Sequence, residues 1–208
     1  MGQIELAVHA PPGFEKEARQ ISIGLRLTGP GDHETLWQAV DSDQPRKALD
    51  FSNLLPGTYW LRTLTTESLC VESATLVGQE VLHRTVIVTP GMTVRLDTTL
   101  STHCATIEGR VVSQNQPAAL AHVAVLLSGT AKSPGDVFLL SAGKDGSFSL
   151  PGLPPGNYLV WAWRRDNPAY PGPANLGEVE ALATPVTAAA DRPAQTGAVR
   201  VLEDLGAK

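Results

Sequence analysis

Apolar and polar residues alternate with a period of two in many short stretches of this 208-residue chain. Successive side chains of a β-strand point to opposite faces, so the alternation predicts strands buried on one face. Gly, Pro, Asn and Asp separate the stretches, as is typical of turns. The predicted strands are residues 3–8, 21–27, 58–63, 85–88, 93–100, 107–112, 122–127, 137–141, 147–150, 158–163 and 198–202.

The absence of any long run with a helical period favours an all-β fold of sandwich or barrel type. Residues 174–183, in a Pro-rich stretch, have room for only a turn or two of helix. Asp145-Gly146 separates two predicted strands and predicts a tight hairpin between them.

Two segments of the chain read alike. Their shared positions are Pro56, Gly57 and Tyr59 in the first, and Pro155, Gly156 and Tyr158 in the second. Pro presets one backbone dihedral and Gly accepts a positive φ, so the pair predicts a turn. The Tyr then enters the next strand, and we expect its hydroxyl to bond to backbone at a sandwich corner. The spacing of 158 − 59 = 99 residues is typical of duplicated domains. We therefore predict two tandem Ig-like β-sandwich domains, residues 1–102 and 103–208.

Composition narrows the class of protein. The chain is 42% hydrophobic and 18% charged, which is too apolar for a disordered protein. Its net charge of −5, without a run of Lys or Arg, argues against binding to nucleic acid. It contains neither an apolar run of membrane-spanning length nor a signal peptide at the start, so for an exported protein we expect the export signal outside this chain.

Four motifs in the second half resemble the carboxypeptidase regulatory-like domain: residues 109–112, 121–125, 144–148 and 153–158. The resemblance extends over about residues 105–165, and residues 55–59 and 88–94 carry a looser version. It implies a transthyretin-like, or prealbumin-like, β-sandwich of the kind found in large bacterial surface and envelope proteins. It says little about function, because such modules accompany peptidases, receptors, adhesins and carbohydrate enzymes.

No residue pattern predicts a catalytic, cofactor or metal site. The five histidines lack metal-ligand spacing, and no Cys-x-x-Cys, nucleophile elbow, phosphate loop or dinucleotide fingerprint occurs. His122 alternates with apolar residues in a predicted strand and is expected to be a strand residue rather than a base. We predict that the chain is not an enzyme and needs no cofactor.

Trp161 and Trp163 are the one candidate ligand platform. They stand two apart in a predicted strand and therefore share a sheet face. On a solvated face they would stack on a sugar ring, which defines the alternative function of a carbohydrate-binding module. The other interpretation, which we favour, is that both pack beneath residues 166–185.

Cys70 and Cys104 are the only cysteines. A disulfide between them and a pair of buried thiols are both compatible with the sequence, since nothing in it shows whether the two Cα atoms approach within about 7 Å.

These observations predict a non-catalytic structural or interaction module of a larger bacterial protein. The expected location is extracellular, at the cell surface or periplasmic. The expected partners are other domains of a longer parent chain, with a glycan or another surface protein as further candidates, and neither nucleic acid nor a membrane as a partner of this segment.

Overall fold

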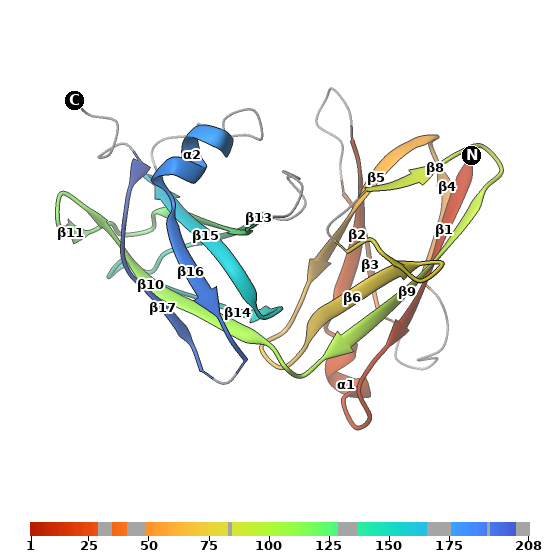
Figure 1. Ribbon diagram of the computed structural model, residues 1–208, viewed down its shortest axis with the longest axis horizontal. Helices are drawn as coiled ribbons and strands as arrows, with labels where there is room; N and C mark the ends of the chain where they lie inside the picture. Colours follow the sequence, from red (N-terminus) through yellow and green to blue (C-terminus); the bar gives the residue numbers. More distant parts are fainter. Residues whose placement is uncertain are drawn as a thin grey trace. The chain divides into compact units, whose positions relative to one another are not determined.

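The computed structural model divides into two compact units, Met1–Cys104 and Ala105–Lys208, each built around its own sheets (Figure 1). It describes residues 1–28, 35–40, 49–82, 85–128, 137–165, 176–190 and 192–202. Each unit is a β-sandwich with short helical segments, so the predicted fold class is confirmed. None of the helices in the described parts of the chain is long and apolar enough to cross a membrane.

Unit 1 has one sheet in the order β4-β1-β9-β6-β7 and another in the order β3-β2-β5-β8. β1 and β9 run parallel, and the other neighbours are antiparallel. The elements are β1 (Gly2–His9), α1 (Glu15–Ala18), β2 (Ser22–Leu27), β3 (Leu36–Ala39), β4 (Leu49–Leu54), β5 (Gly57–Leu64), β6 (Cys70–Leu76), β7 (Gln79–Glu80), β8 (Thr85–Val88) and β9 (Thr93–Ser101).

Unit 2 repeats this plan. Its sheets are β11-β10-β14, with β17 parallel to β10, and β13-β12-β15-β16. The elements are β10 (Ala105–Ser113), β11 (Gln116–Pro117), β12 (His122–Leu127), β13 (Val137–Ser141), β14 (Ser147–Leu153), β15 (Gly156–Trp163), α2 (Leu176–Leu182), β16 (Thr184–Ala188) and β17 (Ala194–Arg200).

The two units differ mainly in the connection that follows β5 or β15. The strands of β4-β1-β9 and β3-β2-β5-β8 correspond in order and direction to those of β14-β10-β17 and β13-β12-β15-β16. After β5 the chain forms β6 and β7, which extend the sheet that contains β9. After β15 the chain forms α2, which lies against β15 (Figure 1).

Each sandwich buries the inward-facing residues of its strands. Along β1, for example, Ile4, Leu6 and Val8 are buried, and the residues between them are partly exposed. Thr98 is the one buried polar side chain among the described residues. This alternation buries apolar side chains on one face of a strand and leaves polar side chains on the other. The burial of apolar surface between the two sheets is the usual source of sandwich stability.

The predicted Asp145-Gly146 hairpin is wrong. Gly146 has a φ of +78° and the chain turns sharply there, with the Gly143 N–H donating to the Ser147 carbonyl at 2.7 Å. However, β13 pairs with β12 and β14 pairs with β10. The turn therefore carries the chain from one sheet to the other. The strand before it, β13, pairs in the sheet of β12, and the strand after it, β14, pairs in the sheet of β10.

Candidate interaction surfaces

The two Pro-Gly-x-Tyr segments occupy equivalent places in the two sandwiches. Tyr59 stands opposite Leu27 and Val86. Tyr158 stands opposite Leu127 and Val186 in the same way. Each Tyr hydroxyl donates to the carbonyl four residues earlier, Tyr59 to Leu55 at 2.9 Å and Tyr158 to Pro154 at 2.5 Å. These bonds tie each strand start to the preceding turn, the structural role expected of a tyrosine corner.

The reason for glycine in these segments differs from the one the sequence suggested. Gly57 and Gly156 begin strands and do not have a positive φ. A Cβ on Gly57 would lie 2.5 Å from Leu27 Cδ1, and one on Gly156 would lie 2.9 Å from Leu127 Cδ1. The positive φ values occur four residues earlier, at Asn53 (57°) and Gly152 (71°). Each glycine therefore lies beneath the end of a leucine side chain, and the interpretation as a positive-φ turn was wrong.

Gly57→Ala and Gly156→Ala are each expected to destabilise their units by about 1 kcal/mol or less, because the added Cβ meets the Cδ1 end of a partly buried leucine that can move aside. Adding Leu27→Ala to the first, or Leu127→Ala to the second, should cost less than the sum of the single changes, because the clash disappears with the leucine. Urea unfolding of the single and double variants measures this coupling. Strict additivity would show that the leucine contact is not the reason for the glycine.

Burial raises the pKa of both corner tyrosines, and for Tyr158 the rise is large. Tyr158 is 1% exposed, so the folded protein resists forming a phenolate there. The resulting stabilisation is fully present below the unfolded pKa of about 10 and is lost as the pH rises toward the higher folded value.

Stability should therefore fall at alkaline pH, by up to about 1.4 kcal/mol per pH unit above pH ~10 for Tyr158. Tyr158→Phe should cost about 1 kcal/mol at pH 8, where it removes one hydrogen bond. Above pH ~10 its unfolding free energy should decline less steeply than that of the wild type. Urea unfolding at a series of pH values tests this, and parallel curves for the two proteins would contradict it.

Trp161 and Trp163 do not form an exposed platform. They are 2% and 6% exposed, on the face of β15 that is turned away from the sandwich core. There they pack in a separate apolar cluster with Leu126 and with Val179 of α2. A sugar ring cannot reach either indole, so the carbohydrate-binding alternative built on these residues was wrong. Of the two interpretations of the pair, packing beneath residues 166–185 is the one that the position of Val179 supports.

The structure joins Cys70 and Cys104 in a disulfide, with Cα atoms 5.7 Å apart. Cys70 begins β6 and stands opposite Ser101 at the end of β9. Cys104 is the last residue of unit 1. The bond therefore fixes the end of unit 1 to its own body at the point where the chain passes to unit 2.

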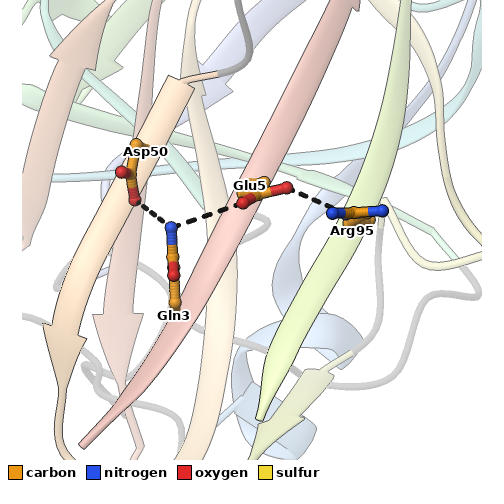
Figure 2. A network of polar contacts seen from close by, with 4 residues as sticks. All are labelled: Gln3, Glu5, Asp50 and Arg95. Atoms are coloured by element: carbon orange, nitrogen blue, oxygen red, sulfur yellow. Dashed lines mark hydrogen bonds and ion pairs between the residues drawn. The ribbon is translucent and has the colours of Figure 1, made fainter. Parts of the chain in front are cut away.

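The outer face of the β4-β1-β9 sheet carries a row of polar contacts (Figure 2). The Gln3 amide donates to Asp50 at 2.9 Å and to Glu5 at 3.4 Å. Arg95 donates through Nε to the other carboxylate oxygen of Glu5 at 2.9 Å. Arg95 is 81% exposed, so water weakens this pair. The arrangement is that of a solvated sheet face whose polar groups satisfy one another.

A hollow of 670 Å³ lies over β10, β14 and β17 in unit 2. Glu108 accepts bonds there from Gln195 at 2.8 Å and from Ser149 at 3.5 Å. At its edge, Asp145 accepts a bond from the Ser147 hydroxyl at 2.6 Å, and this bond holds the pKa of Asp145 below its usual range. In these contacts exposed carboxylates accept from serine hydroxyls and an amide, as polar groups on a solvated sheet face do.

The histidines in the described parts of the chain are dispersed. His9 lies 3.3 Å from Asp97 on an exposed face, and the His122 ring lies 5.3 Å from that of Trp163. Within the described residues, no group of three or more His, Cys, Asp or Glu side chains could hold a metal ion. His33, His83 and Tyr170 lie outside the described residues.

The sequence did not draw attention to Trp37 and Trp60. Trp37 is 40% exposed, and Trp60 stands opposite Arg26 on the outer face of β3-β2-β5-β8. The alternation Trp60-Leu61-Arg62 was the signal available, since Leu61 is buried in the core and its neighbours must face the other way.

No family model matches the chain, and no curated protein matches it by sequence. Solved structures match weakly. The Bacillus anthracis TIE protein has 13% identity and a TM-score of 0.29, with 77% of this chain and 28% of that one covered. A streptococcal ancillary pilin has 16% identity and a TM-score of 0.29, with 77% and 53% covered. GBS52, the minor pilin of Streptococcus agalactiae, has 12% identity and a TM-score of 0.32, with 97% and 94% covered. The chain thus spans 28% and 53% of the lengths of the first two proteins.

Proposed function

We propose that this chain is a non-catalytic structural and interaction module of a larger bacterial extracellular or periplasmic protein. The observation that carries the proposal is the pair of sandwiches of one plan, each with an apolar interior and polar groups confined to outer faces. Among the described residues, no cleft in the interior is lined by converging ionisable groups. A partner of such a module would therefore bind to the outer faces and edges of its sheets. The tandem carboxypeptidase regulatory-like architecture is part of this proposal, and the equivalent tyrosine corners support it.

The disulfide supports the proposed location. Disulfides form and persist in oxidising compartments and are rare in reducing cytosol. Cys70 and Cys104 are the only cysteines of the chain, and they are bonded to each other. The partners that we propose for this two-domain segment are other domains of a longer parent chain.

Thiol trapping in intact cells tests the proposal. Cells that produce the native protein are treated with a membrane-permeant alkylating agent before lysis, and the mass of the protein is measured in each fraction. We expect the protein in the extracytoplasmic or surface fraction with neither cysteine alkylated. A main pool in the cytoplasm with both cysteines alkylated would contradict the proposal.

A further inference from the structure

The first and last strands of unit 1 lie side by side and run in the same direction (Figure 1). β1 pairs with β9 over seven successive positions, beginning with Gln3 opposite Thr93. The chain of unit 1 therefore enters at one end of this strand pair and leaves at the other. Tension applied to the two ends of unit 1 would pull β1 and β9 past each other, in shear, rather than apart.

Shear strains all the hydrogen bonds between two strands at the same time. Peeling the strands apart from one end strains the bonds one after another. A single hydrogen bond contributes little net stability, because its groups bond to water once they are released. A row of bonds that must break together resists much more force than the same bonds broken in turn. The parallel direction of β1 and β9 therefore gives unit 1 resistance to tension along the chain.

Side chains on both faces of the sheet join the same two strands. On the outer face, Arg95 of β9 stands opposite Glu5 of β1 and donates to it at 2.9 Å (Figure 2). On an exposed face, His9 of β1 lies 3.3 Å from Asp97 of β9. On the inner face, Ile4 of β1 is fully buried in the core. Water weakens the polar contacts, so the packing of the inner face adds more to the resistance.

The terminal strands of unit 2 have the same arrangement. β10 pairs in parallel with β17, beginning with Ile107 opposite Ala194. The register shifts once within this pair, beside Gly197, whose φ is +71°. Because one chain joins the two units, tension along the chain passes through both of them. Each unit meets that tension with its first and last strands in shear.

The disulfide directs tension in unit 1 onto the pair of β1 and β9. Cys104 is the last residue of unit 1, and Cys70 begins β6, which pairs with β9 on the side away from β1. Tension at Cys104 therefore acts on the start of β6 and on the end of β9, and it moves the two strands together. Residues 71–103 lie inside the covalent loop. The strands that must slide first are therefore β1 and β9.

We propose that this chain is a tension-resisting module of its parent protein, with the parallel terminal strands of each unit held in shear. This inference rests on the proposed role as a structural module of a larger protein and names the stress that the module withstands. The shared direction of the terminal strands in both units supports it. Binding through outer faces or edges makes no demand on where the chain enters and leaves each sandwich.

Single-molecule pulling of the full chain in two geometries tests the proposal. In the first geometry the chain is held at Met1 and Lys208. In the second it is held at Met1 and through a click-reactive amino acid in place of Met92. The Met92 side chain is 41% exposed, and its carbonyl accepts from the Gln3 N–H at 2.9 Å, so residue 92 lies where β1 begins. The second geometry peels β1 from β9, and we expect it to open unit 1 at about half the force or less.

The disulfide identifies which unfolding step belongs to unit 1. While the bond is intact, unfolding of unit 1 extends only the chain outside the covalent loop. Reductant should lengthen this step by about 120 Å, because the cysteines are 34 positions apart and an extended residue spans about 3.6 Å. The step of unit 2 should keep its length.

Matched variants test whether the pair of β1 and β9 is the part under tension. Ile4→Val and Ile23→Val remove the same carbon from fully buried side chains in the two sheets of unit 1. Urea unfolding gives the loss of unfolding free energy for each variant and establishes that it is folded. At constant force, Ile4→Val should speed the opening of unit 1 by roughly two- to tenfold, and Ile23→Val by less than about twofold.

Equal forces in the two pulling geometries would overturn the inference. So would equal acceleration by Ile4→Val and Ile23→Val for the same loss of stability, or opening of unit 1 at forces no higher than those that extend an unfolded chain. Thiol trapping does not depend on the direction of pulling. A surface protein with bonded cysteines that shears and peels at equal force would keep the proposed function and lose this inference, so the two failures are separable.

Discussion

Trp161→Ala is expected to destabilise unit 2 by about 3–5 kcal/mol, the usual cost of removing a large buried aromatic side chain. The indole is 2% exposed and forms the centre of the cluster between β15 and α2. Its loss leaves a cavity beneath a helix of only seven residues, which has little stability of its own. Chemical denaturation followed by far-UV circular dichroism measures the change.

Trp161→Phe is the matched control. The indole Nε1 is buried, and the described part of the structure provides no acceptor for it. Phenylalanine keeps most of the apolar contact and removes an unsatisfied donor, so it should cost much less than alanine. Equal losses for alanine and phenylalanine, or a loss below about 1 kcal/mol for alanine, would show that the indole is not a packed core residue.

Removing the disulfide is expected to destabilise unit 1 by about 4 kcal/mol and to leave unit 2 unchanged. The bond closes a loop between residues 34 positions apart, and it stabilises the fold chiefly by restricting the unfolded chain. The variant is Cys70→Ala with Cys104→Ala, and the measurement is the unfolding free energy of each unit.

Treatment of the wild type with a reductant should reproduce the effect of the double substitution, which controls for any packing role of the sulfur atoms. A loss shared equally by the two units would contradict the assignment of this bond to unit 1. No loss on either treatment would mean that the bond does not form in solution.

The sandwich plan was predictable because burial on one face gives strands such as β1 and β9 a period of two. The tyrosine corners were predictable too, since Pro-Gly-x-Tyr recurs at a fixed spacing. The surroundings of Gly57 were not predictable, because the side chain that lies over it, Leu27, is remote in sequence and comes close only after the strands pair.

The sequence pattern likewise did not predict which element, if any, covers the outer face of each sheet. Alternation shows that Trp161 and Trp163 share a face, but it does not show that α2 closes over them. The same limitation hid Trp37, which lies in a four-residue edge strand too short to have a recognisable period. Whether a face is open depends on where the connection after β5 or β15 is placed, and strand patterns carry no information about that.

Hydrogen exchange of the full chain, resolved by segment, tests most directly the central claim that two separately stabilised sandwiches of one plan make up the protein. We expect the slowest amides of β1 and β9 to share one opening free energy and those of β10 and β15 to share another. Reductant should lower only the first value, and Trp161→Ala should lower only the second. A single opening free energy for all four strands, lowered equally by both treatments, would contradict the claim.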